Sequence, residues 1–130
     1  MTRVIKRIRL GQKIFYPPPL KEFIFYILKK IFINRGIPYM GIIGLTYRCP
    51  AKCGHCMTGV DKQADKHLEL SKEEIFEVLD IFKKIGVIRI LLFGGEPFIR
   101  DDIVNIIEYS DSLNFVVAVD SNGFYITYDL

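Results

Sequence analysis

Beyond residue 39, short apolar runs alternate with segments of helical periodicity, and no other feature limits the possible folds as strongly. The apolar runs span residues 40–46, 87–93 and 114–119. Each has the length and the nearly continuous apolar character of a strand that is buried on both faces. Segments with helical spacing separate the three runs, so the predicted order is β-α-β-α-β. This order predicts an α/β fold, with a parallel sheet covered by helices and right-handed crossovers.

The first of these helical segments carries signals for both of its ends. Ser71 and Glu74 form a capping box, in which each side chain accepts a hydrogen bond from a free backbone N–H. Gly86 is suited to end the helix. The apolar face consists of Ile75, Val78, Leu79, Phe82 and Ile85. A second helix is predicted after Asp101 and Asp102. Its apolar face consists of Ile103, Ile106 and Ile107.

Each of the three predicted strands ends in an unusual sequence. The first leads into CPAKCGHC at residues 49–56, the second into GGEP at residues 94–97, and the third into SNG at residues 121–123. The carboxyl ends of parallel strands meet at one edge of a sheet, where α/β proteins bind their ligands. We therefore expect the three segments to meet in one functional site.

The cysteine segment holds all three cysteines of the chain, and one interpretation is redox chemistry. Cys53 and Cys56 have the spacing of a dithiol oxidoreductase, CGHC. However, Cys49 lies four residues before Cys53, and a third thiol so close would compete in thiol–disulfide exchange. Lys52 also stands where disulfide isomerases place an aromatic residue.

The other interpretation is metal binding, because three thiolates on one short segment suit zinc or an iron–sulfur cluster. A structural zinc site needs four protein ligands, and the spacing of His67 does not mark it as the fourth. A 4Fe–4S cluster held by three cysteines leaves one iron without a protein ligand. That open position is where a small molecule can bind and react. A non-catalytic iron–sulfur or zinc module is the alternative within this interpretation.

The C-x-x-x-C-x-x-C run after a strand, with GGEP and SNG after the next two strands, resembles the radical S-adenosylmethionine (radical SAM) enzymes. The resemblance covers about residues 40–130. It implies a partial TIM-barrel-like (β/α) fold, of which this chain would supply the N-terminal part and stop after the third strand. It also implies reductive cleavage of S-adenosylmethionine to a 5′-deoxyadenosyl radical, which abstracts hydrogen from an unknown substrate.

The resemblance also assigns roles to residues of this sequence. It implies that the 4Fe–4S cluster is bound by Cys49, Cys53 and Cys56. It implies contacts with S-adenosylmethionine or the substrate for His55, Gly94, Gly95, Glu96, Ser121 and Asn122. Glycines allow a backbone to approach a ligand closely, and their carbonyls and the glutamate would receive the ammonium of the methionine part. His55 would lie near the adenine. No catalytic residue is assigned beyond the cluster ligands.

Residues 1–39 form a basic extension before residues 40–130, the part that resembles the radical SAM domain. Ten of the 18 Lys and Arg residues, but only one of the 15 acidic residues, lie in residues 1–48, a balance of +9. After Pro19, an amphipathic helix is predicted, with an apolar face that consists of Leu20, Phe23, Ile24, Ile27, Leu28, Ile31 and Phe32. We expect this helix to pack on its own protein, as most amphipathic helices do. Docking on an anionic membrane surface is the alternative.

Three cysteines are too few, and odd in number, for a secreted disulfide scaffold. The sequence shows neither a signal peptide nor a stretch long enough to span a bilayer, so a cytoplasmic location is predicted. The expected partners are a substrate, a reducing electron donor, and a C-terminal half or partner chain. The last would cover the open edge of the third strand, which otherwise favours aggregation.

Overall fold

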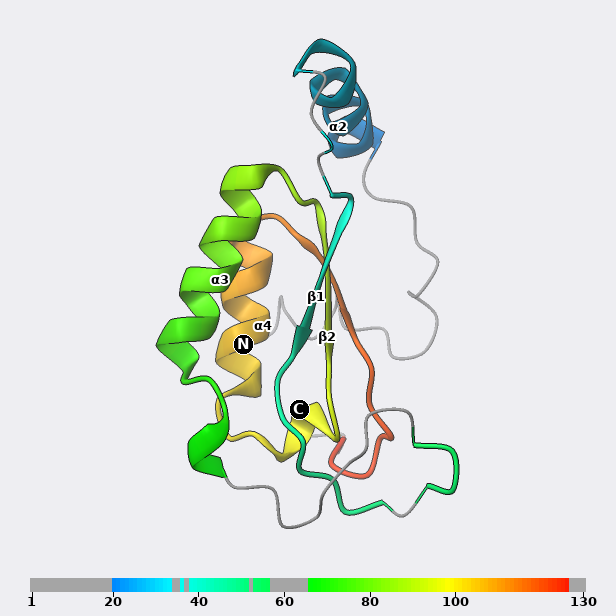
Figure 1. Cartoon of the computed structure of the whole chain (residues 1–130), viewed down its shortest axis with the longest axis vertical. Coiled ribbons are helices and arrows are strands. Elements are labelled where there is room, and N and C mark those ends of the chain that lie inside the picture. Colours follow the sequence, from blue (N-terminus) through cyan, green and yellow to red (C-terminus); the bar gives the residue numbers. More distant parts are fainter. Residues whose placement is uncertain (1–19, 34–35, 37, 52, 57–65, 127–130) are drawn as a thin grey trace.

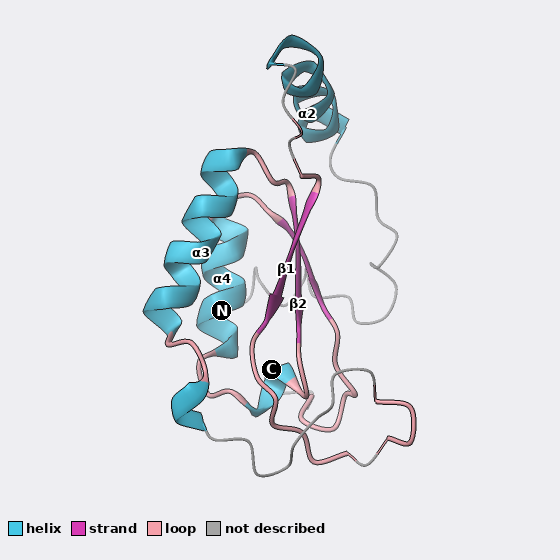
Figure 2. Cartoon of the chain, viewed as in Figure 1, coloured by secondary structure: helices cyan, strands magenta, loops and turns pink. Residues whose placement is uncertain are grey.

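The computed structural model describes residues 20–33, 36, 38–51, 53–56 and 66–126 (Figure 1). In chain order, the elements are α2 (Leu20–Ile33), β1 (Met40–Gly44), the 3-10 turn η1 (Lys66–Leu68), α3 (Lys72–Ile85), β2 (Arg89–Phe93), the 3-10 turn η2 (Pro97–Ile99), α4 (Ile103–Ser112) and β3 (Val116–Val119). Figure 2 shows how these helices and strands alternate. The predicted β-α-β-α-β order is thus confirmed.

The three strands form one parallel sheet in the order β1-β2-β3. Met40 pairs with Arg89, which pairs in turn with Val116, so the strands start level with one another. The sheet is open rather than closed into a barrel, as expected for part of a repeated β/α architecture. Because all three strands run in one direction, the segments that follow them leave the sheet at the same edge.

The start and the end of α3 follow the sequence signals. The Ser71 Oγ accepts a hydrogen bond from the Glu74 N–H at 3.2 Å, and the Glu74 carboxylate accepts one from the Ser71 N–H at 2.7 Å. This is the predicted capping box. Gly86 ends the helix at a φ of 94°, a left-handed conformation that glycine adopts without strain.

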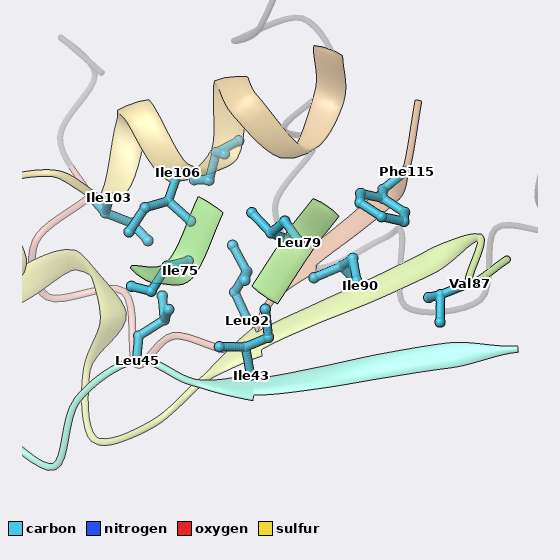
Figure 3. Close-up of a cluster of buried hydrophobic side chains, with 11 residues drawn as sticks. Ile43, Leu45, Ile75, Leu79, Val87, Ile90, Leu92, Ile103, Ile106 and Phe115 are labelled. Atoms are coloured by element: carbon cyan, nitrogen blue, oxygen red, sulfur yellow. The ribbon is translucent and has the colours of Figure 1, made fainter. Parts of the chain in front are cut away.

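Helices α3 and α4 lie on the same face of the sheet, and the core fills the space between them and the strands (Figure 3). The fully or almost fully buried apolar side chains of this core are Ile43, Leu45, Ile75, Leu79, Val87, Ile90, Leu92, Ile103, Ile106, Ile107 and Phe115. Alternate residues of β1 and β2 point into this layer, as the two-residue period of a strand requires.

The opposite face of the sheet is apolar but has no helix over it in the described part of the chain. Ile42 is 52% exposed there, whereas its neighbour Ile43 is only 5% exposed on the helix-covered face. In a (β/α) barrel the helices lie outside and the other face of the sheet lines the interior. The uncovered face therefore corresponds to the inner face of such a barrel.

Helix α2 forms where the sequence predicts it, but it is not half buried. Leu20, Ile24 and Ile31 are 72%, 48% and 66% exposed. Tyr26 alone of the described α2 side chains is buried, and its ring meets that of Tyr39 edge-on, with the ring centroids 5.5 Å apart. The expectation that α2 packs its apolar face on its own protein is therefore wrong for the described residues. No helix in the described ranges is long and apolar enough to cross a membrane.

Candidate functional site at the carboxyl ends of the strands

The chain segments after β1 and β2 continue side by side beyond the sheet. The Gly95 N–H donates to the Thr46 carbonyl at 2.7 Å, and the Glu96 N–H donates to the Arg48 carbonyl at 2.9 Å. These two bonds place the GGEP segment directly against the residues that lead into Cys49. Two of the three strand-end segments singled out in the sequence are thus joined through their backbones.

Close contact between these backbones explains both glycines of GGEP. A Cβ atom on Gly94 would lie 2.4 Å from the Thr46 carbonyl oxygen, and one on Gly95 would lie 2.3 Å from the Arg48 carbonyl oxygen. Gly94 also has a φ of +151°, which side chains rarely allow. We predicted that these glycines let the backbone approach a ligand. In the structure, the carbonyls they approach belong to the residues of this chain that lead into the cysteine segment.

Glu96 joins the third segment to the other two. Its carboxyl is fully buried and accepts hydrogen bonds from the Phe98 N–H at 3.0 Å, the Ser121 hydroxyl at 2.8 Å and the Asn122 N–H at 2.8 Å. Its donors therefore come from η2 and from the SNG segment. The Glu96 side chain therefore links these two segments through hydrogen bonds.

Asn122 completes the convergence by reaching the cysteine segment. Its side-chain amide donates to the Cys49 sulfur at 3.6 Å, and Cys49 is buried. Cys53 and Cys56, by contrast, are exposed on either side of a turn at Gly54 and His55. One thiol of the three is therefore fixed within the site, and the other two lie at its surface.

A polar cluster that the sequence did not reveal holds the start of the cysteine segment. The Arg48 guanidinium donates to both oxygens of the Glu69 carboxylate, at 2.8 Å from Nε and 3.0 Å from Nη2. The Thr46 hydroxyl donates to the same carboxylate and accepts the Arg48 N–H at 2.9 Å. Glu69 lies just after the loop that follows the cysteines, so this cluster joins the two sides of that loop.

Arg100 lies beneath this cluster and is itself buried. Its guanidinium donates to the carbonyls of Leu45 and Leu70, each at 3.0 Å. It also forms ion pairs with Asp102 at 2.8 Å and Glu69 at 3.4 Å. One side chain that follows η2 therefore holds the end of β1, the start of the α3 segment and Glu69 in fixed positions.

These contacts shift the pKa values of the charged groups. The hydrogen bond to Glu69 raises the pKa of Arg48, outweighing desolvation. Burial raises the pKa of Glu69, but hydrogen bonds from Arg48 and Thr46 outweigh it, so the net pKa is lowered. The hydrogen bond from Arg100 lowers the pKa of Asp102. Both carboxyls are consequently held in their charged form near neutral pH.

Sequence comparison agrees with this arrangement. Residues 43–130 match the Radical SAM superfamily, and this stretch contains the cysteine segment, GGEP and SNG. The chain belongs to the radical SAM superfamily. No solved structure matches the chain significantly. Family membership confirms the resemblance seen in the motifs, and the open parallel sheet is consistent with part of the (β/α) barrel that the resemblance implies.

The side chains of this radical SAM chain are suitable donors for an iron–sulfur cluster, but they are not yet close enough together to hold one. Three thiols on one segment, with the Asn122 amide donating to the buried Cys49, are a suitable donor set. Among the described residues, however, no three His, Cys, Asp or Glu side chains are gathered closely enough to hold a metal ion. Metal sites commonly assemble only as the metal binds, because binding is coupled to folding of the ligand segment.

Proposed function

We propose that this chain provides the cofactor-binding part of a radical SAM enzyme, with Cys49, Cys53 and Cys56 as ligands of a 4Fe–4S cluster. Such a cluster, once reduced, would supply one electron for cleavage of S-adenosylmethionine to methionine and a 5′-deoxyadenosyl radical, which would abstract hydrogen from a substrate. The observation that carries the proposal is the convergence of the three strand-end segments on Cys49.

In this proposal the two parts of the cysteine segment have different tasks. Cys49 is held by Asn122, and its neighbour Arg48 is held by Glu69, so this end is already in position. Cys53 and Cys56 lie on an exposed turn, and exposed turns open and rearrange at a low cost in free energy. Binding would therefore rearrange the turn and leave the sheet unchanged.

For S-adenosylmethionine, we assign the backbone carbonyls of Gly94 and Gly95 to the ammonium group. The buried Glu96 carboxyl keeps that backbone in place through its hydrogen bonds with Ser121 and Asn122. Glu96 therefore acts on the ammonium indirectly, by positioning the two carbonyls. His55 is exposed on the turn between Cys53 and Cys56, where its ring is available to stack on a base. The inner face of the sheet, with Ile42 exposed, is available to the substrate.

The test is anaerobic reconstitution of the full chain with iron and sulfide, followed by metal and sulfide analysis and electron paramagnetic resonance of the reduced sample. We expect a cubane signal in the wild type, and loss of iron in Cys49→Ala, Cys53→Ala and Cys56→Ala. Release of 5′-deoxyadenosine from S-adenosylmethionine under reducing conditions then tests cleavage.

His67→Ala serves as the control and also tests the zinc alternative. His67 lies in η1, outside the cysteine segment, so the variant should retain its full iron content. Zinc that binds in place of iron and is lost in His67→Ala would overturn the proposal in favour of a structural zinc module. Disulfide reduction in air without any metal would overturn it in favour of a dithiol oxidoreductase.

A further inference from the structure

We infer that α2 is a membrane-surface anchor, which lies along an anionic lipid bilayer and leaves the cysteine site facing away from it. Helix α2 takes no part in the proposed radical chemistry. The direction of its apolar face, the charges around that face and its place in the fold all suit a lipid surface.

The apolar face of α2 is continuous and points away from the rest of the protein. Successive residues of a helix are about 100° apart, so residues 20, 24, 27 and 31 lie in one stripe. All four are exposed, as are Phe23 and Leu28 on its flanks. Tyr26, the described α2 side chain that is buried, lies about 130° from the stripe by the same geometry. The helix therefore has its buried residue, Tyr26, on the side opposite the exposed apolar stripe.

Lysines border this apolar face on both sides. By the same helical geometry, Lys21 and Lys30 flank the stripe, and Lys29 lies opposite it, with its ammonium 4.9 Å from the centre of the Phe25 ring. Long cationic side chains at the border of an apolar face can reach lipid headgroups while their stems stay in the apolar layer. The whole of residues 1–48 carries ten cations and one acid. An apolar stripe with such a border is typical of helices that bind anionic membranes.

The charge favours a lipid surface over a second copy of the chain. Two α2 helices packed through their stripes would bring four flanking lysines together, Lys21 and Lys30 from each copy, and like charges at such a contact oppose association. An anionic bilayer accepts the apolar face and attracts the same cations. With 14 residues, α2 is too short to span the bilayer and would lie along it.

The position of α2 is compatible with this orientation. It lies beyond the amino ends of the strands, whereas the cysteine, GGEP and SNG segments lie at the opposite end of the sheet (Figure 1). A chain that rests on a membrane by α2 therefore keeps the candidate site open to the aqueous phase.

The experiment is co-sedimentation of the purified full chain with vesicles of phosphatidylcholine containing phosphatidylglycerol, compared with vesicles of phosphatidylcholine alone. We expect the chain to sediment with the anionic vesicles at low salt and to be released at high salt. Ile24→Asp/Ile27→Asp should lower the partition coefficient about tenfold or more, because two apolar side chains of the stripe are lost. Lys21→Glu/Lys30→Glu, at the two lysines that flank the stripe, should lower it by about as much through charge.

Matched controls lie on α3, away from the stripe. Ile81 is 54% exposed, and Lys84 lies on the same helix. The variants Ile81→Asp and Lys84→Glu should bind vesicles as the wild type does. Circular dichroism checks that each variant is folded. The inference is overturned if the wild type stays in solution with anionic vesicles, or if Ile24→Asp/Ile27→Asp binds unchanged. It is also overturned if light scattering shows a dimer that the same substitution dissociates while no vesicle binding occurs. Vesicle binding does not require the iron–sulfur cluster, so a negative result in this experiment would leave the proposed function unaffected.

Discussion

The core between the sheet and α3/α4 and the edge at the carboxyl ends of the strands are held together by different forces. Nearly all side chains of the core are aliphatic, and burial alone fixes them. At the edge, the strand-end segments are joined by backbone hydrogen bonds, by the buried carboxyl of Glu96 and by the buried guanidinium of Arg100. In the described part of the chain, no buried side-chain nitrogen or oxygen there lacks a partner.

The difference explains where change is tolerated. An aliphatic core needs only the right volume and pattern, and many sequences meet that demand. A buried polar cluster needs every hydrogen-bond partner in place, because an unpaired buried charge or carbonyl lowers the free energy of unfolding. The edge can therefore hold Cys49 in a defined position, as a cofactor ligand requires, while the core supplies most of the stability.

The largest effect is expected where the edge depends on one side chain. Arg100→Met keeps the length of the side chain but leaves the carbonyls of Leu45 and Leu70 without their donor and Asp102 without its ion pair. We expect the free energy of unfolding to fall by about 3–5 kcal/mol, as when one partner of a buried ion pair is removed. Urea denaturation measures it.

Lys66→Met is the control for this substitution. Lys66 pairs with Asp101 at 3.5 Å, but both side chains are largely exposed, and such pairs contribute about 0–1 kcal/mol. If the two variants were equally stable, the view that Arg100 holds the edge together would be wrong.

The second prediction compares the two faces of the sheet through adjacent isoleucines of β1. Ile43→Ala opens a cavity in the core and should cost about 2–5 kcal/mol. Ile42→Ala removes the same atoms from the uncovered face and should change stability by only about 0.5 kcal/mol. Urea denaturation of the pair measures both. A cost for Ile42→Ala close to that of Ile43→Ala would mean that the uncovered face is packed in solution, either by another copy or by another part of the chain.

Sequence reasoning succeeded where the signal is local and periodic. The strands and helices, and the capping box of Ser71 and Glu74, follow from spacing over a few residues. Convergence of the strand-end segments followed from parallel topology. The contacts of Glu69 and Arg100 could not be predicted, because they join residues 21 to 55 positions apart and depend on how the loops pack. The only hint in the sequence is Thr46, a polar residue at the end of an apolar run.

The α2 prediction failed for a physical reason as well. Helical spacing of apolar residues shows that a helix has an apolar face, but does not show what that face meets. In the structure, α2 meets Tyr39 through Tyr26, and two tyrosines separated by 13 positions carry no periodic signal.

The smallest effect, and the one that most directly separates edge from core, is the response to acid. The pKa values of Glu69 and Asp102 are lowered in the folded state, so both carboxyls stabilise the fold above their ordinary pKa values of about 4.3 and 3.9. That stabilisation is lost as the pH falls from about 5 through these values toward the lowered folded pKa values. Aliphatic burial does not titrate, so the loss belongs to the edge.

Urea midpoints of the wild type measured between about pH 6 and pH 3 should therefore fall more steeply than those of Glu69→Gln/Asp102→Asn, which lacks both titrating groups. Glu74, whose pKa is lowered by its hydrogen bonds with Ser71, titrates in the same direction in both proteins and cancels in the comparison. Parallel curves would mean that the ion pairs seen at the edge add nothing to stability. The position of Cys49 would then depend on backbone pairing with GGEP and on the hydrogen bond from Asn122.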